Sequence, residues 1–392
     1  MEGALPRRKR ALFAAVTAAV GLGGALLVAE LGLRLHERRA RPRRPAAELD
    51  LLRANPRGSF RLHPHLDLVA EVGRRRIAIR TNSHGMRWRE VSKRKDGRRR
   101  VAFLGDSFTF GCWARSVEHS LVGVFESNVS PTRWEVLNFG VGGYGLKDVE
   151  LLIEEQVLEF GPDFVVVVFF AGNDFRDTYL GLHKDRIVNG TAVLDTELLA
   201  RKVPEEFRGR DRTTSQPSRE RASLPALLRR LALFRFVAPW LSLERLEVDF
   251  RVNRRFIAYS FWSQVPYPPV ALSAKDESLA TLLRIRSLLA GHDVQLGIVA
   301  LPTREQVYAR AGYGPGFDVS FPQAYVQVLA REQAIPYLDL LPVFREHVAG
   351  SNENLYVHGD THLNDAGHRL AGWHVSEWFR CCLKSAGRQP PR

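Results

Sequence analysis

The sequence predicts an α/β fold, in which a central parallel sheet is covered by helices on both faces. From about residue 100, short apolar runs alternate with segments of helical periodicity, the pattern of a parallel sheet with crossover helices. Residues 164–170 read FVVVVFF and are apolar on both faces, as expected for a central strand of such a sheet. The alternation therefore predicts three layers, a sheet with helices on each side of it.

The individual elements follow in alternation. We expect strands at 100–104, 134–138, 164–170, 294–300 and 337–340. We expect helices at 117–128, 147–160 and 363–383. Another helix precedes residue 294, and the pair Ser273 and Asp276 marks its start. Residues 175–272 break the rhythm, and leucines at helical spacing favour a packed helical insertion there, with a lid or a membrane-surface contact as the alternatives.

The N-terminus carries a candidate membrane segment. Residues 11–29 form an uncharged apolar run of 19 residues, long enough to cross a hydrocarbon core as a helix. Basic residues flank the run on both sides, so the positive-inside rule does not settle its orientation. A cleaved signal peptide is the alternative, but no clean cleavage site follows the run. We predict an uncleaved signal anchor at 1–35 and a single-pass membrane protein whose main domain lies outside the cytoplasm, on the periplasmic side.

The net charge of +14 is concentrated at the same end of the chain. Residues 1–100 hold 25 Lys and Arg against 9 Asp and Glu, whereas the rest holds 32 against 34. The main domain therefore has no evident basic stripe, which argues against a nucleic acid as its partner. A basic arm beside a membrane is instead attracted to anionic lipid head groups. We assign 36–97 as a basic linker and approach segment, and 98–385 as the main domain.

The cysteines exclude two further classes of protein. Only Cys112, Cys381 and Cys382 occur, too few for a disulfide scaffold, and no Cys/His spacing resembles a zinc site. We therefore predict neither a metal nor another cofactor, and Cys112 is expected to be a small buried residue.

Four polar blocks stand at the ends of predicted strands or at the start of the last helix. Ligands of open parallel sheets bind beyond the carboxyl ends of the strands, so these blocks are expected to converge. They are 105–111 (GDSFTFG), 138–145 (NFGVGGYG), 172–174 (GND) and 360–364 (DTHLN).

Together the blocks contain the parts of an acyl-transfer site. Ser107 follows a strand and needs a base before its hydroxyl can attack a carbonyl, and His362 is the candidate base. Asp360 is close enough to orient the imidazole. The backbone N–H groups of Ser107 and Gly143 and the side-chain amide of Asn173 are candidate donors to a developing oxyanion.

Each block alone has an ordinary explanation. Gly, Asp and Ser all favour turns, and His362 could simply begin a helix. The glycine block invites a nucleotide-binding interpretation, but it lacks the G-x-G-x-x-G frame and an acidic residue about 20 positions further on. In this order and at successive strand ends, the blocks favour catalysis. His84 and Arg87 of the approach segment are weaker candidates to line the site.

At these residues the sequence resembles the SGNH/GDSL hydrolases, especially the bacterial membrane-anchored members. The resemblance covers roughly 98–175 and 290–380, and the stretch RTNSHGMR before it is similar to the approach segment of those members. It implies a flavodoxin-like fold and activity on esters, often acyl groups on carbohydrates or lipids. It also implies that Ser107 is the nucleophile, Gly143 and Asn173 are oxyanion donors and His362 is the base, whereas Gly140 fits a turn.

The acid block departs from the commonest family pattern. Many members place the acid three residues before the histidine, where this chain has Gly359, whereas Asp360 stands two before it. This resembles the D-x-H version of alginate-acetylation-type members, several of which transfer acetyl groups to exopolysaccharide. An alternative is that Asp365 or another carboxylate orients His362.

The leading hypothesis is a serine-dependent hydrolase of carbohydrate or lipid acyl esters that works through an acyl-enzyme on Ser107. The first alternative is an O-acetyltransferase for cell-surface polysaccharide, because the departure in the acid block leaves hydrolysis and transfer open. The second is a non-catalytic carbohydrate-binding module on the same fold, which the complete Ser, Gly, Asn and His set disfavours.

Overall fold

The computed structural model describes residues 17, 21, 24–33, 51–72, 75–181, 187–188, 191–192, 265–308, 318, 320–357 and 360–386. The chain divides into two units, one of residues 1–43 with 215–244 and one of 44–214 with 245–392. In the first unit, residues 24–33 are helical. Most of the predicted anchor and of the insertion 175–272 lies outside the described residues. Within the described part of the chain, no helix combines the length and the apolar character that crossing a membrane requires.

The second unit is built on a five-stranded parallel sheet in its described part. Its strands are ordered β12 (Tyr337–Asp339), β10 (Gln295–Leu301), β7 (Phe164–Phe170), β5 (Arg99–Gly105) and β6 (Trp134–Asn138). Numbered along the chain, this order is 2-1-3-4-5 read from β6, the flavodoxin-like version of the doubly wound sheet. The direction of winding changes between β5 and β7, which places a ligand crevice beyond their carboxyl ends.

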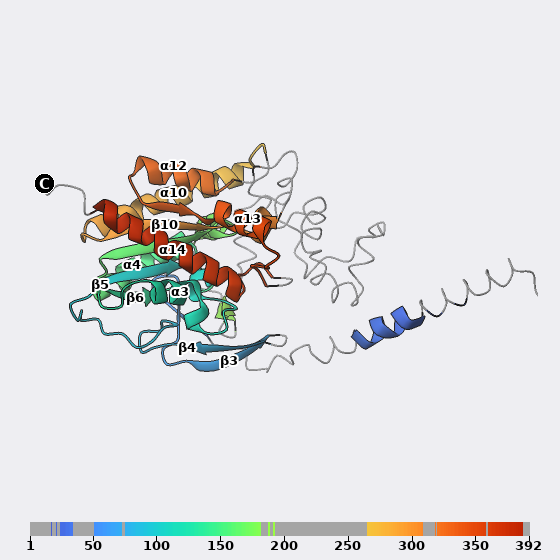
Figure 1. The fold of residues 1–392 in the computed structure, drawn as a ribbon. Coiled ribbons are helices and arrows are strands. Elements are labelled where there is room, and N and C mark those ends of the chain that lie inside the picture. The colour runs from blue at the N-terminus through green and yellow to red at the C-terminus, as the bar shows by residue number, and fades with distance from the viewer. Residues whose placement is uncertain are drawn as a thin grey trace, which may run out of the picture. The chain divides into compact units, whose positions relative to one another are not determined.

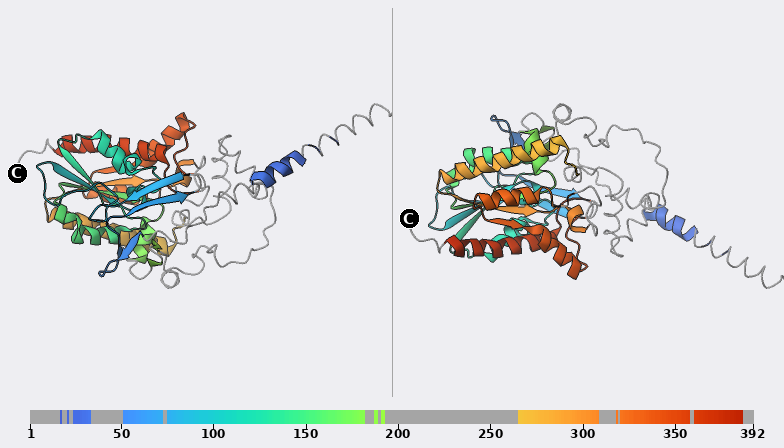
Figure 2. Two further views of the ribbon diagram at one scale, coloured as in Figure 1. Left: turned by 90° about the horizontal axis from the view of Figure 1, so that it is seen from below. Right: turned by 90° about the horizontal axis from the view of Figure 1, so that it is seen from above.

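Helices cover both faces of this sheet. Helices α3 (Leu121–Asn128) and α14 (Asp365–Ala386) lie together on one face, and α4 (Leu146–Glu155) and α10 (Pro269–Ala290) on the other (Figures 1 and 2). All seven residues of β7 are buried, as a strand covered on both faces requires. The predicted three-layer α/β/α fold is confirmed.

The remaining elements are short or lie at the edges of the domain. They are β1 (Leu52–Ala54), β2 (Phe60–Leu62), β3 (Asp67–Val72), β4 (Arg75–Arg80), α2 (Ser107–Phe110), η1 (Val117–His119), η2 (Val157–Phe160), α5 (Asp174–Leu180), β8 (Ile187–Val188), β9 (Thr191–Ala192), α11 (Arg304–Tyr308), α12 (Gln323–Glu332) and α13 (Leu340–Gly350).

Some helix boundaries differ from the expectation for local reasons. The helix predicted at 117–128 is a 3₁₀ turn followed by α3, because the Ser120 side chain accepts a hydrogen bond from the Gly123 N–H and caps a new helix. The start predicted at Ser273 is wrong, since α10 begins at Pro269. Proline suits the first helical position, where its missing N–H costs nothing.

Residues 51–97, predicted as part of a linker and approach segment, fold against the sheet edge at β6. The segment contains the antiparallel pairs β1 with β2 and β3 with β4. The indole Nε1 of Trp88, which is buried, donates to the Val136 carbonyl of β6 at 2.8 Å. Because an uncovered edge strand invites pairing with other chains, this cover protects the sheet.

Ion pairs hold the same segment in place, and one more ion pair joins β5 to β6. Six basic residues between 57 and 100 contact acidic residues between 126 and 159 or at 163. The pairs are Arg57–Glu154 at 3.0 Å, Arg61–Glu155 at 2.5 Å, Arg89–Glu126 at 2.5 Å, Lys93–Glu159 at 2.6 Å, Lys95–Asp163 at 2.8 Å and Arg100–Glu135 at 2.6 Å. Part of the N-terminal positive charge is therefore balanced within the domain.

Candidate active site

Ser107 lies where the sequence predicts it, at the start of α2 directly after β5. The turn before it requires glycine, because Gly105 has φ +151° and a Cβ there would lie 2.6 Å from the Val168 carbonyl oxygen. Asp106 caps α2, since its Oδ1 accepts a hydrogen bond from the Phe108 N–H at 3.0 Å. The tight turn thus presents Ser107 beyond the carboxyl end of β5.

The structure brings Ser107, His362 and Asp360 into one hydrogen-bonded chain. Ser107 Oγ lies 2.8 Å from His362 Nε2, across 255 residues of sequence. His362 Nδ1 lies 2.6 Å from Asp360 Oδ1, which also accepts the His362 backbone N–H at 2.9 Å. The His362 and Asp360 side chains keep 24% and 29% of their surface exposed, so a substrate has access to them. This arrangement suits an imidazole that takes a proton from a serine hydroxyl.

Asp360 is held in its charged form. Burial raises the pKa of Asp360, but hydrogen bonds from His362 and the attraction of its ring outweigh burial, and the pKa falls below its usual value. An ionised Asp360 can select the imidazole tautomer that leaves Nε2 free to accept a proton. It also stabilises the imidazolium that results.

Asp365, the alternative partner of His362, contacts another residue. Its Oδ1 accepts the Arg115 backbone N–H at 3.0 Å, and its Oδ2 lies 3.5 Å from Arg115 Nε. Asn364 caps α14, since its Oδ1 accepts the N–H groups of Ala366 and Gly367. Asp365 therefore sits in the first helical turn, directed towards Arg115 and not towards the imidazole.

The glycine block faces the Ser107 turn. A Cβ on Gly142 would lie 3.8 Å from the Ser107 Cβ, and Gly143 adopts φ +84°, a conformation that favours glycine. A Cβ on Gly140 would lie only 2.2 Å from the Phe110 backbone nitrogen, so Gly140 is needed for close packing against α2. The turn role predicted for Gly140 stays a prediction. The oxyanion role of Gly143 stays a prediction.

Asn173 follows β7 and lies beside Asp106. The Asn173 side chain opposes the rise in the pKa of Asp106 that burial causes, whereas Asn173 Oδ1 is buried with no hydrogen-bond partner in the described structure. The role of Asn173 as an oxyanion donor stays a prediction.

Two buried carboxyl groups next to Ser107 were not predicted from the motifs. Burial raises the pKa of Asp106 to about 6, and burial together with the nearby Asp106 raises the pKa of Asp174 well above its usual value. Asp174 Oδ2 accepts the Phe170 N–H at 2.9 Å. The signal was present in the sequence, since GDS and GND each place an aspartate directly at a strand end. Only the pairing of β5 with β7 shows that the two meet.

His368 and Cys112 have structural roles behind the Ser107 turn. His368 is fully buried, its Nδ1 accepts the Leu121 N–H at 3.2 Å, and its Nε2 lies 3.1 Å from the Cys112 carbonyl oxygen. Burial lowers the pKa of His368 to about 4, so the ring is neutral near pH 7. Burial also raises the pKa of the Cys112 thiol to about 12, which opposes thiolate chemistry.

His84 and Arg87, the weaker candidates, make contacts elsewhere. His84 packs edge-on against the Phe160 ring at 5.0 Å, and its Nε2 lies 3.1 Å from the Val91 carbonyl oxygen. Arg87 is buried, and its guanidinium lies against the carbonyl oxygens that end α2. Arg87 thus lies at the opposite end of α2 from Ser107.

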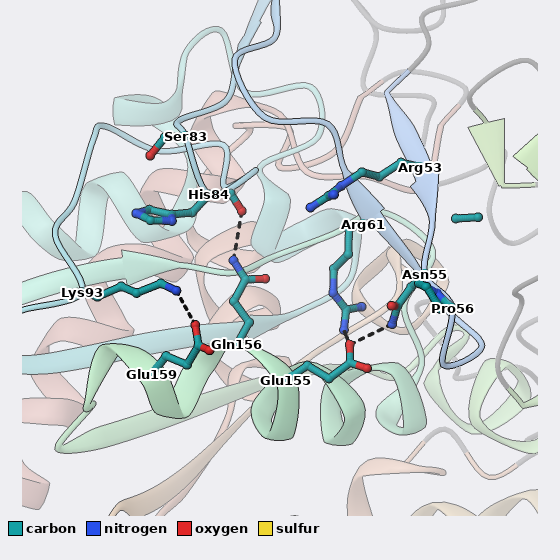
Figure 3. Close-up of a pocket in the computed structure, with 11 residues that line it drawn as sticks. Arg53, Asn55, Pro56, Arg61, Ser83, His84, Lys93, Glu155, Gln156 and Glu159 are labelled. Carbon is teal, nitrogen blue, oxygen red and sulfur yellow. Dashed lines mark hydrogen bonds and ion pairs between the residues drawn. The ribbon is translucent and has the colours of Figure 1, made fainter.

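A polar cleft of about 330 Å³ lies between the approach segment and the end of α4 (Figure 3). Its lining does not include Ser107, Asp360 or His362. Glu155 accepts hydrogen bonds from Arg61 and Asn55, and Lys93 pairs with Glu159. The polar groups of this cleft are thus largely hydrogen-bonded or ion-paired to one another, as at a contact between two parts of one domain.

Comparison with known proteins identifies one family segment. Residues 262–389, about a third of the chain, match the model of the SGNH hydrolase-like domain of acetyltransferase AlgX. This segment contains Asp360 and His362, whereas Ser107, Gly143 and Asn173 precede it. The predicted resemblance to the SGNH/GDSL hydrolases is confirmed. Among curated protein sequences, none matches the chain.

The chain is also distantly similar to solved structures of a G-D-S-L family protein and of two esterases. A G-D-S-L family protein from Desulfitobacterium hafniense DCB-2 is 13% identical, with 71% of this chain and 98% of that one covered at a TM-score of 0.38. A two-domain esterase active on acetylated mannans is 14% identical. The match covers 75% of this chain and 52% of that one, and the TM-score is 0.38. An acetyl xylan esterase is 14% identical. The match covers 72% of this chain and 98% of that one, and the TM-score is 0.37.

Proposed function

We propose that this protein is a serine-dependent esterase of the SGNH type that acts on acyl groups of carbohydrates. The observation that carries the proposal is the hydrogen-bonded chain from Ser107 through His362 to Asp360. Support comes from the family model over 262–389, which includes both His362 and Asp360. A non-catalytic binding module has no use for an imidazole held 2.8 Å from a serine hydroxyl by a half-buried carboxylate.

The proposed reaction begins when Ser107 Oγ attacks the carbonyl carbon of the ester. His362 Nε2 takes the hydroxyl proton, and Asp360 stabilises the imidazolium. The tetrahedral intermediate collapses as the C–O bond to the leaving alcohol breaks, and His362 returns the proton to that alcohol. An acyl ester on Ser107 remains. A second nucleophile, deprotonated by His362, then attacks this ester. The bond between the acyl carbon and Ser107 Oγ breaks, and His362 returns the proton to Ser107.

The second candidate function is O-acetyl transfer to a polysaccharide. It differs from hydrolysis only in the second nucleophile, which is a sugar hydroxyl in place of water. Two observations favour it: the D-x-H spacing of Asp360 and His362, and the match of residues 262–389 to a domain of an acetyltransferase. The active-site residues serve both outcomes, so the acceptor decides between them.

The test is a screen of full-length protein in detergent with short-chain aryl esters and acetylated glycans. We expect acyl release from an acetyl ester, measured as free acetate. In the presence of an unacetylated glycan, mass spectrometry of the glycan distinguishes transfer from hydrolysis. If neither free acetate nor acetylated glycan forms from any donor, the enzyme proposal is wrong and the binding module becomes the better hypothesis.

We further propose that residues 1–35 anchor the protein in a membrane with the main domain outside the cytoplasm. Support comes from the apolar run 11–29 and from the described helical residues 24–33, where Leu26, Leu27, Val28 and Leu31 are between 47% and 70% exposed. An exposed cluster of large apolar side chains on a helix is unfavourable in water but suits a lipid environment.

This anchor gives a direct prediction. Full-length protein is expected to stay in the membrane pellet after carbonate extraction, because carbonate strips peripheral proteins but not a buried apolar helix. Deletion of residues 1–45 is expected to release a folded protein with unchanged ester turnover. Recovery of the full-length chain in the soluble fraction, with a mature N-terminus beyond residue 30, would instead identify a cleaved signal.

A further inference from the structure

A buried arginine holds the end of the helix that begins with Ser107. Arg87 is 1% exposed, and its Nη1 donates to the carbonyl oxygens of Phe110 at 3.1 Å and Gly111 at 2.6 Å. Its Nη2 donates to the Ala78 carbonyl oxygen of β4 at 2.9 Å. The guanidinium carbon also lies 4.8 Å from the centre of the Phe110 ring. One side chain thus connects β4, in the approach segment, to the end of α2.

The carbonyls that Arg87 holds have few other partners. Gly111 O also accepts the Ala114 N–H at 3.1 Å, whereas the Arg87 guanidinium is the partner described for Phe110 O. Helix α2 has only four residues, so its own hydrogen bonds provide little rigidity. A fixed cation at its C-terminal end satisfies a buried carbonyl and restrains the whole turn.

The same turn sets the geometry of the proposed nucleophile. Ser107 is the first residue of α2, and Phe110 is the last. A tilt of this single turn moves Ser107 Oγ relative to His362 Nε2, which sits on a different segment of the chain. A misplacement of about 1 Å can reduce turnover on the order of 10²-fold.

We propose that Arg87 is a positioning residue, which holds α2 so that Ser107 Oγ stays within hydrogen-bond distance of His362. This inference rests on the proposed function, since it assumes that Ser107 is the nucleophile. Lysine is a poor substitute, because a planar guanidinium reaches three carbonyls in fixed directions whereas an ammonium is a single point charge. Arg87 acts through α2 and does not touch the substrate.

Arg100 offers a matched control. It is also 1% exposed, and its guanidinium also holds backbone carbonyls, those of Lys93 at 2.8 Å and Phe160 at 2.7 Å among them. It stands near the start of β5, whereas Ser107 follows the end of that strand. Loss of either arginine leaves buried carbonyls unsatisfied and lowers stability. Only the loss of Arg87 is expected to disturb the Ser107 turn.

The experiment compares Arg87→Met, Arg87→Lys and Arg100→Met in the full-length protein. We expect Arg87→Met to lower kcat for an aryl ester about 10- to 100-fold with KM changed little, and to slow fluorophosphonate labelling by a similar factor. Arg87→Lys is expected to lie between wild type and Arg87→Met. Arg100→Met is expected to lower Tm with kcat close to wild type. If Arg87→Met does not fold, the comparison of Arg87→Lys with Arg100→Met carries the test.

Two outcomes overturn the inference. In the first, kcat of Arg87→Met falls no further than kcat of Arg100→Met. If Arg87→Met does not fold, kcat of Arg87→Lys takes its place in this comparison. The other is a crystal structure of the same Arg87 variant in which Ser107 Oγ and His362 Nε2 keep their 2.8 Å separation. If the wild type has no ester turnover and no labelling, the proposed function fails. The separation in the variant then still decides whether Arg87 positions Ser107.

Discussion

Ser107→Ala is expected to abolish ester turnover while the fold stays intact. The hydroxyl is the atom that forms the bond to the acyl group, and its contact with His362 Nε2 at 2.8 Å is the route for its proton. In well-studied serine proteases, removal of the nucleophile costs on the order of 10⁶ in kcat. Stability is expected to change by less than about 1 kcal/mol, because Ser107 is half-buried and its hydroxyl is not part of the core.

The measurement is turnover of an aryl ester together with labelling by a fluorophosphonate probe. Cys112→Ala is the matched control, since Cys112 lies five residues further on and carries a thiol, the side chain nearby that is intrinsically most nucleophilic. We expect the Cys112→Ala variant to be labelled like the wild type, because burial keeps the Cys112 thiol of the wild type protonated and therefore unreactive. Labelling of Ser107→Ala at the rate of the wild type would show that the probe reacts elsewhere and that the assignment of Ser107 is wrong.

The second large effect is expected at the acid. Asp360→Asn should reduce kcat by orders of magnitude, because an amide at 2.6 Å from His362 Nδ1 favours the wrong tautomer and cannot stabilise the imidazolium. The equivalent change in the catalytic triad of a serine protease costs on the order of 10⁴ in kcat. We expect little change in Tm, since Asp360 is half-buried and lies outside the regular elements of the domain.

Asp365→Asn is the matched control for Asp360→Asn. It makes the same chemical change five residues away, on a side chain that contacts Arg115. Turnover is expected to stay near wild type, and stability to fall by about 0.3–1 kcal/mol through the lost interaction with the helix dipole. Both variants should be compared at the same pH. A large loss of turnover in Asp365→Asn contradicts the role assigned to Asp360. Wild-type turnover in both variants contradicts it as well.

The sheet and the residues that meet at its edge could be predicted from local sequence. A run such as FVVVVFF over 164–170 has few alternatives to a central strand, because no face of it can meet water at low cost. The polar blocks stand at strand ends, and in a parallel sheet these ends share one edge. Ser107, His362 and Asp360 could therefore be chosen from residue type and order, although 255 residues separate the serine from the histidine.

Contacts between distant segments decided the rest. Nothing in the sequence of 51–97 distinguishes a basic linker from a segment that covers β6. Its ion pairs and the hydrogen bond from Trp88 to the Val136 carbonyl join residues far apart in the chain, and no sequence pattern relates the two partners. The choice between Asp360 and Asp365 depended on where each carboxylate points, which spacing alone does not specify. Arg87 is one of 25 basic residues in the first hundred, and its sequence context marked it only as a weaker candidate to line the site. Only the packed structure shows its guanidinium on the α2 carbonyls, because hydrogen bonds to backbone oxygens leave no residue-type signature in the sequence.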